Sequence, residues 1–212
     1  KALPPIGDEE KPFELPVGWE WCFLSDITAI VTDGDHQAPP KSDSGVPFLV
    51  IGNLNTGRVD FRGCRYVPVE YFDSLDWGRK PKKGDLLYTV TGSYGIPVTI
   101  NSNEEFCVQR HVAILKACKS SPMHYLTRAL AAQYAYEYAT LIATGIAQKT
   151  VPLTGLRKML VALPPEKEQE RIVSRVNELA NLFDKLKSQL SIAQTTQTVI
   201  DTLSTRPDIL ES

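Results

Sequence analysis

The residues closest to a catalytic motif form the segment Thr91-Gly-Ser-Tyr-Gly95, which differs from the Gly-x-Ser-x-Gly nucleophile turn only at its first position. In such a turn the serine attacks a carbonyl carbon, and His111 and His124 lie downstream as candidate bases. The motif requires a helix after the serine, whereas residues 96–98 (Ile-Pro-Val) predict another strand. We therefore favour a glycine-rich turn that brings its backbone and small hydroxyl groups close to a ligand. A tight hairpin without a ligand and a hydrolase that uses Ser93 are the alternatives.

Other catalytic signatures are absent from the sequence. It contains no G-x-x-x-x-G-K-[ST] phosphate loop, no G-x-G-x-x-G fingerprint and no H-E-x-x-H zinc motif. The three histidines lie far apart and the four cysteines form no C-x-x-C pair, so no metal site is predicted. Scattered cysteines of this kind are typical of reduced thiols in a cytoplasmic protein. These observations favour a binding protein over an enzyme.

Charge is unevenly distributed along the chain. The formal net charge is −2, yet residues 41–165 carry fifteen lysines and arginines against nine acidic residues. Seven of these basic residues lie between Arg58 and Lys83. Such a segment is compatible with a DNA-facing surface, and a solvated charged face explains it equally well. No apolar run approaches the ~18 residues of a membrane helix, so no membrane partner is expected.

The segments that must position these side chains predict an α+β fold with a β-rich core and a few helices. Residues 1–14 are rich in proline and acids and are interpreted as a linker, and residues 15–165 as a globular domain. Runs of β-branched residues predict strands, and Ala, Leu and Tyr at helical spacing predict a helix that Gly145 ends. The predicted strands are 46–51, 58–69, 86–90, 96–100 and 108–115, and the predicted helix is 123–144.

A long helix is predicted over residues 166–205, which contain neither glycine nor proline, and a tail over 206–212. Its apolar side chains recur in steps of four and three, the 3.5-residue period of a coiled-coil seam. At 1.5 Å per residue the helix would be about 60 Å long and would need a partner helix. A solvated terminal helix that frays beyond Leu190 is the alternative. The seam comprises Ile172, Val176, Leu179, Phe183, Leu186, Leu190, Ala193, Gln197 and Ile200.

Several segments, in their order along the chain, resemble the specificity subunit of type I restriction-modification enzymes. Leu15-Pro-Val-Gly-Trp-Glu-Trp resembles the start of a target-recognition domain, and residues 83–95 (Lys-Gly-Asp-Leu-Leu-Tyr-Thr-Val-Thr-Gly-Ser-Tyr-Gly) are similar to its central strand and turn. Gln109-Arg-His-Val-Ala and Gly145-Ile-Ala-Gln-Lys-Thr-Val follow, as in many members. The most specific segment is Leu163-Pro-Pro-Glu-Lys-Glu-Gln-Glu-Arg-Ile-Val, which resembles the exit into a conserved helix.

The resemblance implies DNA recognition without catalysis. Family members carry two target-recognition domains, each reading one half of a split DNA site, and two long antiparallel helices separate them. This chain holds one such domain and one such helix, and residues 1–16 resemble the linker into the second domain. It is therefore interpreted as the C-terminal half of a longer subunit, with a natural half-length subunit that dimerises as the alternative. The helix would pair with the other half of the subunit or with a second copy.

A recognition domain places polar side chains on base edges and basic side chains on phosphates. We expect base readers in three loops, namely His36 with Gln37, Ser93 with Tyr94, and Gln148 with Lys149. Their structural alternatives are an Asx turn closed by His36, a packed Tyr94 and a helix cap by Gln148. Arg110 and His111 fall inside a predicted strand and are assigned to support of the turn. The expected phosphate anchors are Arg58, Arg62, Arg65, Arg79, Lys80, Lys82 and Lys83. For residues 79–83 a solvated turn is the alternative.

The resemblance also implies the partners. In this family the methyltransferase (modification) subunits hold S-adenosylmethionine and the restriction, or motor, subunits use ATP and magnesium, so this chain is expected to bind none of these cofactors. The expected partners are double-stranded DNA and those subunits, in the cytoplasm. The alternative function is a coiled-coil adaptor or scaffold without DNA sequence readout.

Overall fold

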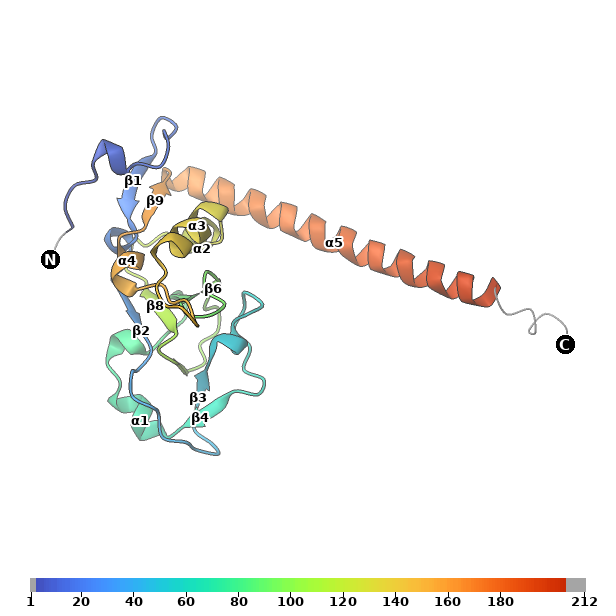
Figure 1. Ribbon diagram of the computed structural model, residues 1–212, viewed down its shortest axis with the longest axis horizontal. Helices are drawn as coiled ribbons and strands as arrows, with labels where there is room; N and C mark the ends of the chain where they lie inside the picture. Colours follow the sequence, from blue (N-terminus) through green and yellow to red (C-terminus); the bar gives the residue numbers. More distant parts are fainter. Residues whose placement is uncertain (1–2, 205–212) are drawn as a thin grey trace. The chain divides into compact units, whose positions relative to one another are not determined.

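The computed structural model describes residues 3–204 of the chain, which forms two compact units, Lys1–Gln169 and Glu170–Ser212 (Figure 1). The predicted α+β class, with a long helix at the C-terminal side, is confirmed. The division between the units lies a turn later than the boundary predicted at residue 165. The tail 206–212 and the last residue of the predicted helix, Thr205, lie outside the described residues.

The main sheet of unit 1 has four antiparallel strands. In spatial order its strands are β2 (Ile30–Asp33), β8 (Val112–Lys116), β5 (Leu86–Thr89) and β6 (Pro97–Thr99). Strands β2 and β6 form the edges. The central strands β8 and β5 consist mostly of apolar residues and are buried along their whole lengths.

Two smaller sheets complete the strands of unit 1. The first pairs β3 (Val46–Leu49) with β4 (Arg65–Val67) and, in parallel, with β7 (Cys107–Val108). The second pairs β1 (Glu20–Phe23) with β9 (Leu160–Leu163), which lie side by side in Figure 1. One hydrophobic core joins the main sheet to the first of these, and its buried members are Leu49, Leu54, Leu87, Val98, Ile100, Phe106, Val108, Val112 and Ile114.

Short helices connect and cover these sheets. The α-helices of unit 1 are α1 (Val69–Ser74), α2 (Met123–Leu130), α3 (Gln133–Ile142) and α4 (Leu153–Arg157). The 3-10 helices are η1 (Asp8–Glu10), η2 (Leu24–Ile27), η3 (Ile51–Asn53) and η4 (Trp77–Arg79). The Arg157 guanidinium fixes α4 to β2 by donating to the Val31 carbonyl oxygen, at 2.6 Å from Nη2. Within the predicted linker, Phe13 packs edge-on against Trp21, with ring centroids 4.9 Å apart.

Three of the predicted elements are wrong in extent. Strand 108–115 is interrupted because the Val112 N–H donates to the Gln109 carbonyl oxygen and closes a turn. Only Arg65–Val67 of segment 58–69 is a strand, since Asp60 and Arg62 hold the preceding residues in a turn. Helix 123–144 breaks at Ala131–Ala132, because the backbone of Ala132 is extended, with φ −72° and ψ 152°, and a second helix begins at Gln133.

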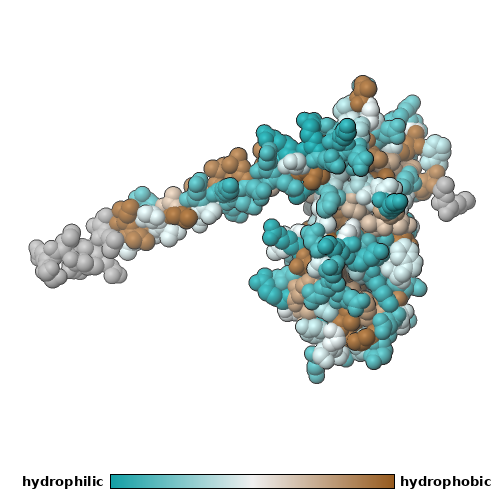
Figure 2. All heavy atoms as spheres, turned by 180° about the vertical axis from the view of Figure 1, so that it is seen from behind, coloured by the Kyte–Doolittle hydropathy of each residue, from teal (hydrophilic) through white to brown (hydrophobic). Residues whose placement is uncertain are grey.

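Unit 2 continues the helix α5 (Glu166–Ser204), which begins directly after Pro164-Pro165 as predicted. Leu182, Ile192 and Val199 add exposed apolar positions outside the predicted seam. Figure 2 shows hydrophobic side chains in patches along this helix, between hydrophilic ones. Among the predicted seam residues the exposed fractions are Val176 37%, Leu179 51%, Phe183 66%, Leu186 55%, Leu190 59% and Ile200 50%, while Ile172 is half-buried.

A buried ion pair fixes one end of the main sheet. The Lys116 ammonium at the end of β8 meets the Asp85 carboxylate just before β5, and the two side chains are 2% and 0% exposed. Lys116 also donates to the Lys80 carbonyl oxygen at 2.8 Å. Asp85 accepts from the backbone N–H groups of Lys82 and Ala117, both at 2.9 Å. Both charges are therefore compensated by a partner and by further hydrogen bonds.

Removing either partner should destabilise unit 1. Lys116→Met and Asp85→Asn are each expected to lower the free energy of unfolding by about 3–5 kcal/mol, because each leaves an uncompensated buried group. Denaturant titration of the whole chain measures the change. Lys83→Met is the matched control, since it removes an exposed lysine from the same turn and should leave the midpoint unchanged. An unaltered midpoint for Lys116→Met would contradict the role given to the pair.

Candidate nucleic-acid interface

The topology brings several loops to one end of the main sheet. Strands β2 and β5 both run antiparallel to β8, so their carboxyl ends lie beside its amino end. Residues 34–40 follow β2, residues 90–95 follow β5, and residues 109–111 precede β8. Together with the α3–α4 loop, residues 143–150, these segments are called the loop cluster.

The turn at residues 109–111 links the loop cluster to both larger sheets. Its Gln109 N–H donates to the Leu49 carbonyl oxygen at 3.0 Å, at the end of β3. Gln109 also forms a parallel bridge with Asp35. The His111 carbonyl oxygen accepts from the Val90 N–H at 3.0 Å. The turn at residues 109–111 therefore lies between two other loops. One contains His36 and Gln37, and the other is the turn at residues 91–95, called the glycine turn.

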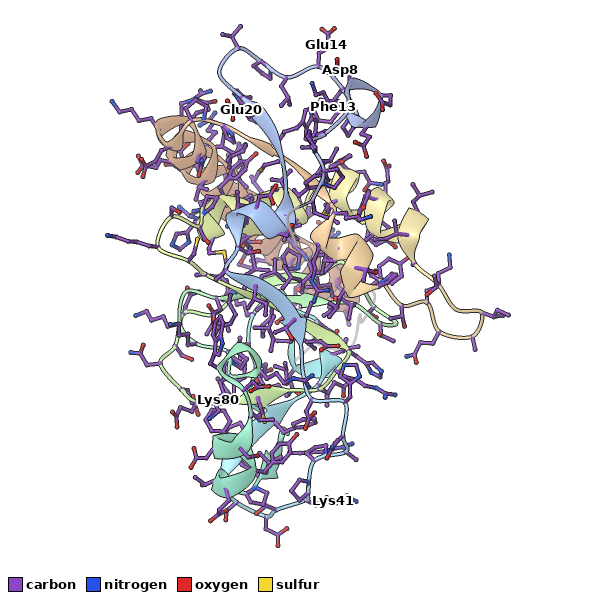
Figure 3. The ribbon with its side chains drawn as sticks, turned by 90° about the vertical axis from the view of Figure 1, so that its left-hand side faces the viewer. Asp8, Phe13, Glu14, Glu20, Lys41 and Lys80 are labelled. Atoms are coloured by element: carbon purple, nitrogen blue, oxygen red, sulfur yellow. The ribbon has the colours of Figure 1, made fainter. Side chains whose placement is uncertain are left out.

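The α3–α4 loop is attached to the glycine turn by its backbone. The Gly92 N–H donates to the Lys149 carbonyl oxygen at 3.0 Å, and Thr150 forms a bridge with Thr91. The base of the loop is closed because the N–H groups of Thr144 and Thr150 each donate to the other's carbonyl oxygen, at 2.9 and 2.8 Å. Figure 3 shows the segment between α3 and α4 projecting from the body of unit 1. Two predicted pairs, Ser93 with Tyr94 and Gln148 with Lys149, thus come together.

The glycine turn requires glycine at two positions and packs against α3. Gly92 and Gly95 have φ values of +67° and +91°, and a Cβ at Gly95 would lie 2.9 Å from the Tyr136 ring. Tyr94 stacks on Tyr136 with centroids 5.7 Å apart. The Tyr94 hydroxyl donates to the Thr140 hydroxyl at 3.1 Å, so packing against α3 is one role of Tyr94.

The surroundings of Ser93 do not form a nucleophile site. The chain continues from the turn into β6, as the sequence predicted, and not into a helix. In the described part of the chain, residues 3–204, no histidine hydrogen-bonds to the exposed Ser93 hydroxyl, and no group of three or more His, Cys, Asp or Glu side chains is placed to hold a metal ion. The turn therefore lacks both the following helix and the hydrogen-bonded base that a serine nucleophile requires.

Asp35 organises the loop after β2 and was missed by the sequence reasoning. Its carboxylate accepts from Arg79 Nη1 at 3.0 Å and from the Tyr71 hydroxyl at 3.0 Å, and burial together with this contact raises the pKa of Tyr71. Arg79 Nη1 also donates to the Gly34 carbonyl oxygen at 2.9 Å. The backbone N–H of Gln37 donates to the same carboxylate at 3.4 Å. Arg79 is half-buried beneath the loop, and its charge is balanced by the Asp35 carboxylate.

The two histidines of the loop cluster are held differently. His36 is 63% exposed, and its Nε2 lies 2.9 Å from Asp33 Oδ2, so the ring is oriented but accessible. His111 is half-buried, with Nδ1 2.7 Å from Gln109 Nε2. Burial, and then the charge of Arg110, lower the pKa of His111, so its ring is neutral near pH 7. Arg110 and His111 both lie in a turn, so the prediction that placed them inside a strand is wrong, and Arg110 is exposed.

The predicted phosphate anchors fall into separate places. Lys82 and Lys83 are exposed in the turn before β5, at the opposite end of that strand from the glycine turn, and Lys80 donates to the Asp73 carbonyl oxygen at 2.8 Å nearby. The exposed cations of the loop cluster are instead Lys149 and Arg110. The polar run Gln109-Arg-His111 between two apolar strands was the signal in the sequence that could have identified Arg110 as an exposed turn residue.

The remaining basic residues lie between β3 and β4 or on β4. Arg58, Arg62 and Arg65 are all exposed there. The Arg62 guanidinium donates two hydrogen bonds to the Asp60 carboxylate and lowers the pKa of Asp60 to about 2. Part of the charge of Arg62 is therefore balanced within the protein. Arg65 also lines a groove of about 620 Å³ between β4 and residues 38–43, which includes Lys41. The lining of this groove therefore contains two cations, Lys41 and Arg65, and one acid, Asp43.

Comparison with known proteins gives consistent relatives in sequence and in fold. No family model matches the chain. It is 28% identical over 215 residues to the EcoEI specificity subunit of Escherichia coli and 27% identical over 205 residues to the EcoAI specificity subunit of the same species, and each match covers 93% of the chain. Its curated homologues are type I restriction enzyme specificity subunits. The chain spans about a third of their length, 35% and 34% respectively.

Solved structures from type I restriction-modification systems share the fold. One match is a chain from a structural study of complex assembly and conformational transition of the type I R-M system. It aligns with a TM-score of 0.69, at 21% identity, over 89% of this chain and 45% of that one. The HsdS subunit from Thermoanaerobacter tengcongensis aligns with a TM-score of 0.64, at 22% identity, over 90% of this chain and 45% of that one. The part of the chain described here contains no helix long and apolar enough to cross a membrane.

The contact between the loop after β2 and the turn at residues 109–111 can be tested with a single methyl group. A Cβ at Gly34 would lie 1.9 Å from the Val108 carbonyl oxygen, so Gly34→Ala forces the two segments apart. We expect a loss of about 1–3 kcal/mol in the free energy of unfolding, as for other overpacked sites. Gly52→Ala is the matched control, because no atom lies within 4 Å of its Cβ position. Equal stability of the two variants would show that the segments do not touch.

Proposed function

We propose that this chain recognises one half of a split DNA site on behalf of a type I restriction-modification complex, without catalysing a reaction itself. The observation that carries the proposal is the convergence of four loops, with amide, hydroxyl and imidazole groups, at one end of a rigid sheet. A protein that reads bases needs such groups on an exposed edge, with cations beside them for phosphates. The specificity-subunit homologues support the same role.

The side chains of the loop cluster divide the work. His36, Gln37, Ser93 and Gln148 are the proposed base readers, and a good bidentate contact discriminates between bases by about 1–3 kcal/mol. Arg110 and Lys149 bind phosphates next to them. Tyr94 and Arg79 have a supporting task, which their internal contacts favour. Further phosphate contacts are assigned to two other basic sets, Arg58, Arg62 and Arg65 beside β3–β4, and Lys80, Lys82 and Lys83 before β5.

Unit 2 is the proposed spacer. Its 39-residue helix, counted from Glu166, corresponds to about 58 Å at 1.5 Å per residue, and its exposed seam suits a second helix from the same subunit or from another copy. Methyltransferase and restriction subunits are the proposed protein partners. In this proposal S-adenosylmethionine, ATP and magnesium are held by those subunits and not by this chain.

A domain exchange tests the proposed function. A complete specificity subunit that contains this chain is assembled with its methyltransferase subunits, and methylated sites are mapped on random DNA. Replacing residues 1–165 by another recognition domain should change one half of the split motif and leave the other half unaltered. An unchanged motif would show that the domain is a scaffold, the alternative function.

The helix seam has its own test. Phe183→Glu and Leu186→Glu place charges on the exposed apolar seam and should abolish helix pairing, measured as a loss of the dimer, or of the association with the other half of the subunit, in sedimentation velocity. Lys187→Glu, at an exposed position next to Leu186, is the control and should pair normally. Pairing that survives both seam variants would exclude this face of the helix as the contact.

A further inference from the structure

The most exposed large apolar side chain in the described residues sits at the tip of the loop cluster. Ile146 has an exposed fraction of 106%, whereas Val151, just after the same loop, is 1% exposed. An isolated isoleucine held entirely in water gives no stability to the fold, since it removes no apolar surface from solvent. Singly exposed apolar residues are common, and Val17 is also fully exposed, at 104%. Ile146 differs because it lies beside an exposed amide and an exposed cation in the loop cluster, and this setting points to a contact with another molecule.

The loop presents Ile146 in a fixed direction. Its base is closed by the paired hydrogen bonds of Thr144 and Thr150, and its far side is tied to Gly92 through Lys149. Gly145 begins the loop with a φ of +106°, and a Cβ there would lie 2.5 Å from the Gln148 carbonyl oxygen. Only five residues, 145–149, lie between the paired threonines, so the tip has little freedom to fold back onto the domain.

The neighbours of Ile146 indicate the chemistry of its partner. The same five residues include an exposed amide, Gln148, and an exposed cation, Lys149, which suit a base edge and a phosphate. The edge of a base pair in the major groove offers one apolar group, the 5-methyl group of thymine, and apolar side chains contact it. We propose that Ile146 reads a thymine by packing on its 5-methyl group, beside the bases and phosphate met by Gln148 and Lys149.

This inference rests on the proposed function and makes it more specific. It assigns at least one thymine to the half-site read by this chain, under the tip of the α3–α4 loop. Burying one methyl group stabilises a complex enough to change its affinity about fourfold. The contribution is therefore small beside the whole interface but measurable at a single position.

The experiment removes the two methyl-bearing partners separately. The complete specificity subunit, assembled with its methyltransferase subunits, is titrated with DNA that carries the mapped site, with each thymine of this half replaced in turn by deoxyuridine. One replacement should weaken binding of the wild-type complex about fourfold. The same replacement should leave the affinity of the Ile146→Ala complex nearly unchanged, because the contact has already been lost.

Two controls separate the possible roles of the loop. Lys149→Gln should weaken binding to every DNA equally and keep the effect of deoxyuridine, since it removes only a phosphate contact. Ile146→Ala should melt at the wild-type temperature, because its side chain is fully exposed.

Three results would overturn the inference. The first is a half-site that contains no thymine, and the second is an equal effect of every deoxyuridine on wild type and Ile146→Ala. The third is a defect of Ile146→Ala in assembly with the methyltransferase subunits before DNA is added, which would make the tip a protein contact. If the complex shows no sequence preference that depends on this domain, the proposed function fails as well, so the two failures are distinguishable.

Discussion

The geometry of unit 1 depends on the buried pair of Lys116 and Asp85. The pair joins the end of β8 to the start of β5 and so sets the register in which Leu86 lies opposite Leu115. A slip of one residue would separate the two charges inside the protein and would exchange the two buried faces of the strand, so that its side chains no longer fit their neighbours. Because both strands are only four or five residues long, the register at this end determines where the glycine turn and the 109–111 turn emerge at the other. The loop cluster is thus positioned by an interaction that it does not itself contain.

Much of the fold could be predicted from local pattern. The helix α5 follows from a long stretch without glycine or proline and a sustained seam, and strands β3, β5 and β6 follow from β-branched runs bounded by turns. The break at Ala131 could not be predicted, because it lies inside a run of good helix formers, whereas the polar run Gln109-Arg-His111 marked the interruption of the strand over 108–115. The ion pair of Arg79 could not be predicted either, because its carboxylate partner, Asp35, lies 44 positions away in the sequence.

For the candidate site, the sequence indicated residue types better than arrangement. Glycine-rich loops with amides and hydroxyls were correctly expected to be exposed turns, and the structure brings two of the three predicted loop pairs into backbone contact. The basic residues were the weaker part, since charge along a chain does not show which cations already have an internal acid. Arg62 and Arg79 have such partners, whereas Lys82, Lys83 and Lys149 are exposed. Assigning cations to DNA therefore requires the fold.

The closure of the α3–α4 loop by Thr144 and Thr150 uses main-chain atoms alone. Apart from Gly145, nothing in the frame depends on which side chains occupy the positions between them. Single-codon changes at 146, 147 and 148 can therefore pass through a population without loss of folding, and each would alter the chemical group presented at the tip. Under the proposed function, such a change would alter the preference of the loop in one mutational step and leave its folding frame in place.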